Sequence, residues 1–213
     1  MDRVILFDMD GVLMNTEVLH YTIWQQVFAE QGVIIDFEHY KGCIGSTNAR
    51  LMELIYEGYG ADFRSDESVI LRFSQLNQEY IRTHGVPPIE GVAQTLAQLK
   101  AKGYRMAVAS SSPLKNIEMC LQSLQIQHFF DVLFSSEQVA RPKPAPDVFL
   151  AAAAAMDAAP ATCVVVEDST NGTRAARAAG MYCIGFDNPD SPGQCLDAAD
   201  VRIHHFAQLL DIL

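Results

Sequence analysis

Short apolar runs rich in β-branched residues alternate with amphipathic stretches along most of the chain. Five apolar runs have the length of strands, and they lie at Val4–Asp8, Tyr104–Ser110, Val132–Ser135, Cys163–Asp168 and Met181–Phe186. The amphipathic stretches among them lie at Val92–Lys102, Pro113–Leu124, Asp147–Met156 and Thr170–Ala179. Strands that alternate with helices indicate a parallel sheet whose crossover connections place helices on both faces. The pattern predicts an α/β fold with a doubly wound, Rossmann-like parallel sheet.

One segment departs from this alternation. From about Thr16 to Thr83 the apolar residues recur with helical spacing and no convincing strand pattern is present. Glycine and proline residues flank the segment, which favours a hinge at each end. We therefore predict a core made of residues 1–15 and 88–213, and a helical cap made of residues 16–87 that is inserted after the first strand.

Composition and charge narrow the class of protein. The 213 residues include 15 basic and 26 acidic side chains, a formal net charge of −11, and 49% are hydrophobic, as in an ordinary globular protein. Because the chain has no basic run or stripe, we expect no nucleic-acid partner. The longest apolar run, Phe149–Met156, is far shorter than the roughly 20 residues that a membrane helix needs, and we expect no membrane partner.

The cysteines and the first residues bear on the compartment. Five cysteines is an odd number, and their wide spacing without a Cys-x-x-Cys pair argues against a disulfide framework and against a structural zinc site. The segment Met1–Phe7 has too short an apolar region for a signal peptide. We expect a cytoplasmic protein. We also expect a monomer, because no conspicuous exposed apolar stripe remains once the helices are assigned.

Polar side chains follow the predicted strands, at the edge of the sheet where parallel α/β proteins bind ligands. The first strand ends in Asp8-Met9-Asp10-Gly11 and the second in Ser110-Ser111-Ser112. Lys143 follows the third strand, and Glu167-Asp168 ends the fourth. The sequence therefore predicts that carboxylates, hydroxyls and one ammonium group converge on a single crevice.

This combination of groups favours phosphoryl chemistry. Clustered carboxylates repel one another unless a cation lies among them, and Mg²⁺ prefers such hard oxygen ligands. A magnesium ion together with a lysine and a serine hydroxyl would receive a phosphoryl group, so we predict a phosphate ester as substrate. Two aspartates separated by one residue suggest divided roles. Asp8 would attack phosphorus, and Asp10 would protonate the leaving alkoxide and later take a proton from water.

The residues resemble the motifs of the haloacid dehalogenase superfamily of phosphotransferases. The four motifs occur in order as Asp8-Met9-Asp10-Gly11-Val12, Ser110, Lys143 and Glu167-Asp168. The resemblance is to the branch with a helical cap after the first motif, which includes β-phosphoglucomutase and many sugar phosphatases. With the cap it covers nearly the whole chain. Dehalogenases of the superfamily lack the second aspartate of the first motif, so Asp10 argues for phosphoester chemistry.

The resemblance implies a role for each matching residue. Asp8 would be the nucleophile and Asp10 the acid/base. Ser110 and Lys143 would bind the phosphate, and we place the neighbouring Ser111 with them. Asp8, the main-chain carbonyl of Asp10, and Asp168 would hold Mg²⁺, with Glu167 supporting them. From the residues alone, Ser110 could instead cap the helix that starts near Pro113.

Two enzymatic activities and one non-enzymatic role remain open at this stage. β-Phosphoglucomutases have a cap loop Lys-Gly-x-Ser-Arg whose arginine grips the second phosphate of a bisphosphate. Here Lys41-Gly42-Cys43 is followed by Ile44-Gly45-Ser46-Thr47-Asn48, so that arginine is absent from its place, although Arg50 could compensate. We therefore favour a phosphatase of a small phosphorylated metabolite, a sugar phosphate, over a mutase. The third hypothesis is a catalytically silent binding or regulatory protein on the same scaffold.

The predicted cap supplies the candidates for substrate specificity. His20 stands four residues before Trp24, a spacing that β-phosphoglucomutase shares, and it could face the cleft. Core packing explains Trp24 better than a substrate role does. Asn48 and Arg50 are the other two candidates, because they lie at and beyond the loop where mutases carry their arginine.

Overall fold

A six-stranded parallel sheet forms the centre of the protein. The computed structural model describes residues 4–44 and 47–213. The strands run in the order β3-β2-β1-β4-β5-β6, and every pair of neighbours is parallel. Their bounds are β1 Val4–Phe7, β2 Arg105–Ser110, β3 Val132–Ser135, β4 Cys163–Glu167, β5 Tyr182–Phe186 and β6 Val201–Ile203. Because the strands are parallel, the carboxyl ends of β1, β2 and β4 share one edge of the sheet. The strand order reverses between β1 and β4, and at such a point the edge has a crevice where a ligand can bind.

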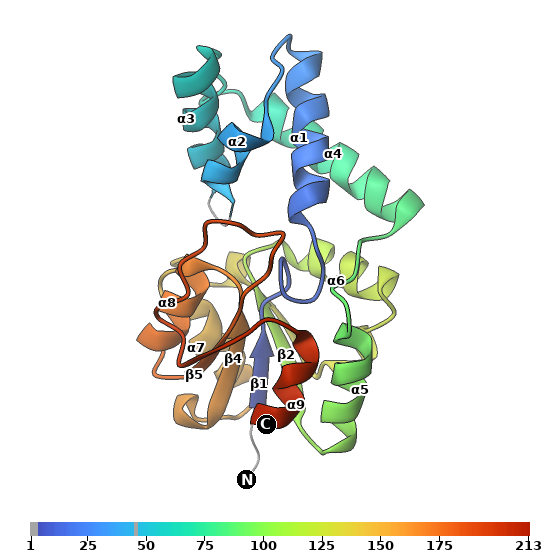
Figure 1. Ribbon diagram of the computed structural model, residues 1–213, viewed down its shortest axis with the longest axis vertical. Coiled ribbons are helices and arrows are strands. Elements are labelled where there is room, and N and C mark those ends of the chain that lie inside the picture. Colours follow the sequence, from blue (N-terminus) through green and yellow to red (C-terminus); the bar gives the residue numbers. More distant parts are fainter. Residues whose placement is uncertain (1–3, 45–46) are drawn as a thin grey trace.

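Two hydrophobic clusters cover the two faces of the sheet. Successive residues of a strand point to opposite faces, so Ile5 and Phe7 belong to one cluster whereas Val4 and Leu6 belong to the other. Helices α5 Val92–Ala101, α6 Leu114–Ser123 and α9 Leu209–Ile212 pack on the first face. Helices α7 Asp147–Ala155 and α8 Thr170–Ala178 pack on the second (Figure 1). The predicted doubly wound α/β sheet is confirmed.

Each predicted strand and core helix is present, with its ends within one residue of the prediction. The short strand β6 was not predicted. It has three residues at the edge of the sheet, and Arg202 at its centre is exposed, so the sequence carries no buried apolar run there. Short 3₁₀ segments complete the described structure: η1 Lys41–Cys43, η2 Gln127–Phe129, η3 Ser136–Gln138, η4 Pro160–Thr162 and η5 Phe206–Gln208.

Between β1 and α5 the chain forms a separate layer of helices, which we call the helical insert. It contains α1 Glu17–Glu30, α2 Phe37–Tyr40, α3 Asn48–Tyr59 and α4 Glu67–His84, and it lies beyond the carboxyl edge of the sheet (Figure 1). Its interior is aromatic: the rings of Trp24 and Phe73 stack with centroids 4.2 Å apart, and Trp24 also stacks on Phe28. The stacking of Trp24 on Phe73 packs α1 against α4.

The two segments that connect the sheet to the helical insert lie side by side. The Asn15 N–H donates to the carbonyl of Pro87 at 2.8 Å, and the Ile89 N–H donates to the carbonyl of Leu13 at 3.4 Å. Met14 and Pro88 form an isolated antiparallel bridge between these bonds. The chain therefore leaves the core and returns to it through one short hydrogen-bonded pair of segments.

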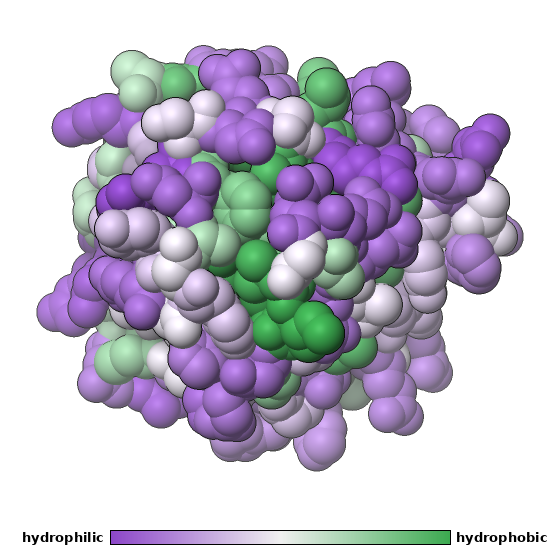
Figure 2. Space-filling view, turned by 90° about the horizontal axis from the view of Figure 1, so that it is seen from above, coloured by the Kyte–Doolittle hydropathy of each residue, from purple (hydrophilic) through white to green (hydrophobic). Residues whose placement is uncertain are grey.

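The surface of the insert end is largely polar. Seen from above, hydrophilic residues cover most of this face and apolar residues gather near its centre (Figure 2). Among the described helices, none combines the length and the apolar character needed to cross a bilayer.

Candidate active site

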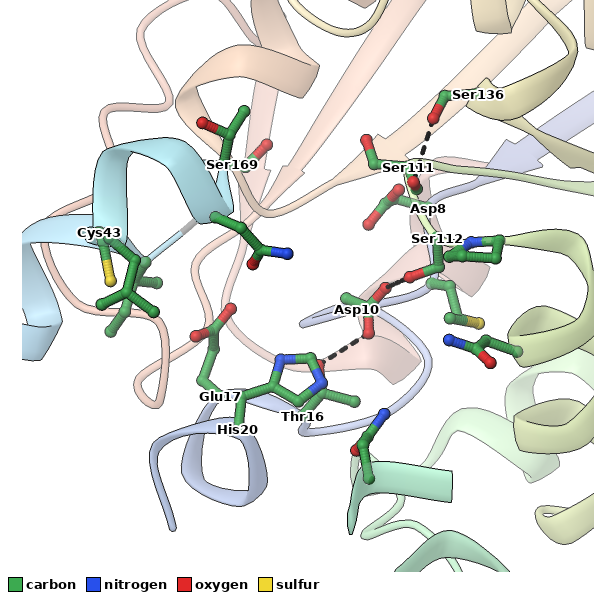
Figure 3. Close-up of a pocket in the computed structure, with 18 of the residues that line it drawn as sticks. Asp8, Asp10, Thr16, Glu17, His20, Cys43, Ser111, Ser112, Ser136 and Ser169 are labelled. Carbon is green, nitrogen blue, oxygen red and sulfur yellow. Dashed lines mark hydrogen bonds between the residues drawn. The ribbon is translucent and has the colours of Figure 1, made fainter. Parts of the chain in front are cut away.

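The carboxyl edge of the sheet and the helical insert enclose a cavity of about 540 Å³. Its sheet side is lined by Asp8, Asp10, Lys143, Glu167 and Asp168, which are separated by up to 160 positions in the chain. Its insert side is lined by residues of α1, α3 and α4. In Figure 3, Glu17 and His20 of α1 lie across the cavity from Asp8 and Ser111, with Asp10 between them. The carboxylates and the ammonium group that were predicted to converge on one crevice all line this cavity.

Lys143 lies at the centre of the charged groups. Its Nζ donates to Asp8 Oδ1 at 2.6 Å, to Glu167 Oε1 at 2.7 Å and to the carbonyl of Ala109 at 3.2 Å. Burial by itself lowers the pKa of Lys143, but the carboxylates of Asp8 and Glu167 outweigh it and raise the pKa above its ordinary value. The raised pKa favours the charged ammonium form, which bridges the ends of β1 and β4.

Asp8 and Glu167, which bind this ammonium group, form a cluster of three buried carboxylates with Asp168. Oxygen atoms of Asp8, Glu167 and Asp168 lie within 4.8 Å of one another. Burial raises the pKa of Asp8 to about 7, although Lys143 opposes the shift, and burial together with Glu167 raises the pKa of Asp168. When all three carboxylates are ionised, they and the one ammonium group carry an excess of two negative charges, which one divalent cation would neutralise. The set of hard oxygen ligands fits Mg²⁺.

Two glycines make room for these carboxylates. A Cβ at Gly172 would lie 1.6 Å from Glu167 Oε1, and a Cβ at Gly11 would lie 2.0 Å from Asp168 Oδ2. Glu167 is also held by Ser169, whose N–H and hydroxyl donate to Oε2 at 2.8 and 2.9 Å. Since any larger residue would displace a carboxylate, these close approaches explain why glycine occupies both positions.

Two hydroxyl groups hold the side chain of Asp10. The hydroxyl of Ser112 donates to Asp10 Oδ2 at 2.8 Å, and the hydroxyl of Thr16 donates to Oδ1 at 2.9 Å (Figure 3). Ser112 follows β2 in the core, whereas Thr16 precedes α1 of the insert. The side chain of Asp10 is thus fixed by one hydroxyl from each side of the cavity, and it is separate from the cluster of Asp8, Glu167 and Asp168.

The serines after β2 differ in their exposure to the cavity. Ser110 is completely buried, and its Oγ accepts the N–H of Ser112 at 3.0 Å. Ser110 does not line the cavity, whereas Ser111 and Ser112 do. The assignment of the phosphate to Ser110 stays a prediction, and the hydroxyl that faces the cavity next to Asp8 belongs to Ser111.

The three specificity candidates of the insert occupy different places. His20 and Asn48 line the cavity. The ring of His20 packs edge-on against Phe73, and burial lowers the pKa of His20, so the imidazole is neutral. Arg50 does not line the cavity but pairs with Glu53 at 3.1 Å and Glu57 at 3.5 Å on the surface. Gly45 and Ser46 of the loop that precedes Asn48 lie outside the described residues.

Several site residues were missed by the sequence analysis, and most lie in the loop after β5. Asn188 Nδ2 donates to the carbonyl of Gly11 at 2.9 Å, and Ser191 hydrogen-bonds Asp168. Gln194 accepts the N–H of Thr170 and donates to the carbonyl of Ile44 at 2.9 Å, which joins the core to the insert. This loop has neither periodicity nor a motif. The signal that could have drawn attention to it is its position after a strand, at the ligand-binding edge.

Comparison with known proteins decides the family. The model of the haloacid dehalogenase-like hydrolases matches residues 5–186. The chain belongs to the haloacid dehalogenase-like hydrolase family. Among the curated members of this family, protein CbbY of Cereibacter sphaeroides is 31% identical over 98% of this chain and 94% of its own length. The fructose-1-phosphate phosphatase YqaB of Escherichia coli is 32% identical over 93% of this chain and 96% of its own length.

Members of the family with solved structures share the fold over nearly the whole chain. CbbY from Rhodobacter sphaeroides in complex with phosphate superimposes with a TM-score of 0.85 at 29% identity, covering 98% of this chain and 96% of that one. The β-phosphoglucomutase of Bacillus subtilis is 27% identical over 97% of this chain and 91% of its own length. Phosphatases and a mutase of this hydrolase family therefore resemble the chain to similar extents, and the choice between them depends on the site.

Proposed function

We propose that the protein is a Mg²⁺-dependent phosphatase of a small phosphorylated metabolite, a sugar phosphate, and that it acts through a phosphorylated Asp8. The observation that carries the proposal is the cluster of Asp8, Lys143, Glu167 and Asp168 on the sheet side of the cavity, with Asp10 beside it. The names of the sugar-phosphate phosphatases among the relatives agree with it. In this proposal residues 1–15 and 88–213 supply the chemistry, and residues 16–87 cover the substrate.

The chain's own residues divide the reaction between them. A carboxylate oxygen of Asp8 attacks phosphorus, and the bond from phosphorus to the alcohol oxygen breaks. Asp10 gives its proton to the leaving oxygen. In the second step Asp10 takes a proton from water as the water oxygen attacks the phosphoaspartate, which releases phosphate and restores Asp8. Lys143 balances the negative charge throughout, and Mg²⁺, held by Asp8, Asp168 and the Asp10 carbonyl, would add further charge stabilisation when bound.

The environment of Asp10 suits a group that must change its protonation state. Both its oxygens accept a hydroxyl hydrogen bond in the structure, from Ser112 and Thr16. Since one donor belongs to the core and the other precedes α1, a movement of the insert relative to the core would alter the orientation of Asp10. Closure over a substrate would in this way set the acid/base in place.

The position of Arg50 favours the phosphatase over the mutase. A mutase must hold a bisphosphate, and Arg50, which could have replaced the missing loop arginine, instead pairs with Glu53 and Glu57 away from the cavity. Among the described residues that line the cavity, Lys143 is the one lysine or arginine, and it already serves Asp8 and Glu167. The insert side therefore offers no fixed positive charge for a second phosphate.

The decisive assay measures phosphate release and isomerisation side by side. The panel contains an aryl phosphate, a hexitol monophosphate, fructose 1-phosphate and β-glucose 1-phosphate with and without a bisphosphate activator, all with Mg²⁺ present. We expect phosphate release without isomerisation. Isomerisation with little release would establish the mutase, and an enzyme inert on the entire panel would favour the silent binding protein.

Magnesium is expected to stabilise the folded protein even without substrate. The ion would relieve repulsion among Asp8, Glu167 and Asp168, so at about 100 times its Kd it should raise the free energy of unfolding by about 2.7 kcal/mol. For a chain of this size that is a rise in Tm of roughly 5–10 °C. The measurement is a thermal melt followed by the fluorescence of Trp24, with potassium chloride of equal ionic strength as the control. An equal rise in Tm with potassium would contradict a magnesium site.

Substitution of Gly11 tests the position of Asp168. Gly11 and Gly32 have nearly the same positive φ, +78° and +79°, but a Cβ at Gly32 would meet nothing within 4 Å. Gly32→Ala should therefore show the cost of the backbone conformation alone, about 1 kcal/mol. Gly11→Ala should show the same cost and also displace Asp168, which lowers the affinity for Mg²⁺ by at least ~10-fold. Equal Mg²⁺ affinities of the two variants in a calorimetric titration would show that Asp168 does not bind the ion.

A further inference from the structure

The loop between β5 and β6 runs along the carboxyl edge of the sheet, beneath α2 and α3 of the insert (Figure 1). Asn188 and Ser191, whose bonds to the core are described above, are only 5% and 6% exposed. Further along the loop, the N–H of Cys195 donates to Thr170 Oγ1 at 2.7 Å, which ties the loop to the first residue of α8. The loop is therefore held to the core on both sides of Gln194.

Gln194 uses the two ends of its amide group on two different parts of the protein. Its Oε1 accepts the N–H of Thr170 in the core, and its Nε2 donates to the carbonyl of Ile44 in the insert, each at 2.9 Å. Because a backbone N–H only donates and a carbonyl only accepts, these two partners fix the orientation of the amide. The side chain of Gln194 also lines the cavity. It is thus a direct bridge between the core and the insert at the cavity wall.

This bridge lies away from the hinge. The chain crosses between the core and the insert through the paired segments that contain Asn15 and Pro87. Ile44 instead follows α2 and η1, and α2 and α3 stand on the other side of the insert from α4, which leads back to the core (Figure 1). When a rigid body rotates about a hinge, the points far from the hinge move most. Opening of the cavity by such a rotation would therefore break the bond from Gln194 to Ile44.

We propose that Gln194 is a positioning residue that clasps the helical insert to the core and keeps the cavity closed around the bound ester. The inference rests on the proposed phosphatase function and goes beyond it, because it assigns closure to a residue outside the four motifs. Gln194 takes no part in the reaction at phosphorus. It acts through the insert, which shields the reacting groups from bulk water. Loss of the clasp should lower the population of the closed form and so weaken the apparent affinity for substrate.

The buried cysteines give a measure of opening that needs no turnover. Cys120 of α6 lines the cavity and is 3% exposed, and burial raises the pKa of its thiol to about 12, so it should react slowly with iodoacetamide while the cavity is closed. Cys163 and Cys183 are as deeply buried but belong to strands of the sheet, so they should react only when the protein unfolds. Cys195 is exposed and shows that the reagent is active.

Gln194→Glu breaks the clasp and spares the rest of the bridge. One carboxylate oxygen can still accept the N–H of Thr170, whereas the other faces the carbonyl of Ile44, and two acceptors repel each other. In mass spectrometry the alkylation rate of Cys120 should rise by at least ~5-fold, and the rates of Cys163 and Cys183 should stay within about 2-fold of the wild type. With Mg²⁺ present, KM for the aryl phosphate should rise by at least ~3-fold and kcat should stay within about 2-fold.

Gln208→Glu is the matched control. Oε1 of Gln208 accepts the N–H groups of His204 and His205 at 2.8 and 2.9 Å, and the residue does not line the cavity. The substitution makes the same change from amide to carboxylate and keeps the acceptor, but it breaks no bond to the insert among the described residues. The alkylation rate of Cys120 and the KM should therefore equal those of the wild type. Should Gln194→Glu fail to fold, Gln194→Met removes the same donor without adding a charge.

Three outcomes would overturn the inference. An unchanged alkylation rate of Cys120 in Gln194→Glu would show that this bond does not hold the insert. An equal rise at Cys120, Cys163 and Cys183 would show a general loss of stability instead of opening. An unchanged KM would show that the clasp does not serve substrate binding. The failure of the phosphatase function would look different, because the wild type with Mg²⁺ would then release phosphate from no ester while the alkylation rates still report on the clasp.

Discussion

Asp8→Asn is expected to lower the rate of Mg²⁺-dependent phosphate release from an aryl phosphate by a factor on the order of 10⁴ or more. The amide keeps the shape of the carboxyl group but cannot attack phosphorus, so no phosphoaspartate forms. The measurement is the initial rate of phosphate release at saturating Mg²⁺. Asp157→Asn is the matched control, because Asp157 is exposed in a loop far from the cavity and has a positive φ that asparagine also adopts. Residual activity of Asp8→Asn above about one per cent of the wild type would remove Asp8 from its role as nucleophile.

Asp8→Asn should also change how the free energy of unfolding depends on pH. The pKa of Asp8 is about 7 in the folded protein against 3.8 ordinarily, because burial disfavours its charge. Between these two pKa values the metal-free folded protein retains a proton that the unfolded chain has lost. The free energy of unfolding of the wild type in a chelator should therefore fall as pH rises from 3.8 to about 7. Asp8→Asn should show a shallower fall over that range, and an unchanged slope in denaturant melts would contradict the raised pKa.

Lys143→Met is expected to have the largest effect on stability, and it should also remove activity. The side chain of Lys143 is 6% exposed and pairs with side chains of Asp8 and Glu167 that are 10% and 1% exposed. Breaking a buried pair by removing one partner typically costs about 3–5 kcal/mol, because the other charges stay buried without compensation. Here two carboxylates lose their counter-charge while Asp168 remains beside them. The measurement is the free energy of unfolding from urea melts without Mg²⁺.

An exposed pair in the same protein supplies the control for that measurement. Lys100 pairs with Asp131 at 2.9 Å, and their side chains are 40% and 38% exposed. Lys100→Met makes the same chemical change where water screens both charges, so it should cost no more than about 1 kcal/mol. Equal costs for Lys100→Met and Lys143→Met would show that the buried cluster is solvated to a greater extent than the structure indicates.

The sheet and the reacting groups could be predicted because both follow from the chemistry of buried parallel strands. A strand that is covered on both faces must be apolar throughout, as in Val164-Val165-Val166, and this signal is local in the sequence. The polar residues that end such strands, among them Asp8 and Asp168, must then share one edge of the sheet. The fold, and the meeting of these side chains at one edge of the sheet, could therefore be predicted without knowledge of contacts between distant residues.

The features that were not predicted depend on contacts that no local pattern encodes. Whether Ser110 or Ser111 faces the cavity is decided by the turn after β2, where Ser110 is used to bind the N–H of Ser112. Arg50 turns to Glu53 and Glu57 because these carboxylates lie within reach on the same helix. Asn188 and Gln194 act through a few side-chain hydrogen bonds from an irregular loop. Each of these is a choice between neighbours of similar chemistry, and only the packed structure makes it.

The adjacent entry and exit of the insert have a consequence for the folding and divergence of the chain. Asn15 and Pro87 are hydrogen-bonded to each other, so from the viewpoint of the sheet the intervening residues are a loop whose ends are already tied. The entropy of closing a loop grows only slowly with its length once the ends are fixed. Mutations that lengthen, shorten or rebuild the helices of the insert should therefore change the free energy of unfolding of the core sheet only slightly. The helical insert can therefore diverge in sequence and length at little cost to the stability of the sheet that supports it.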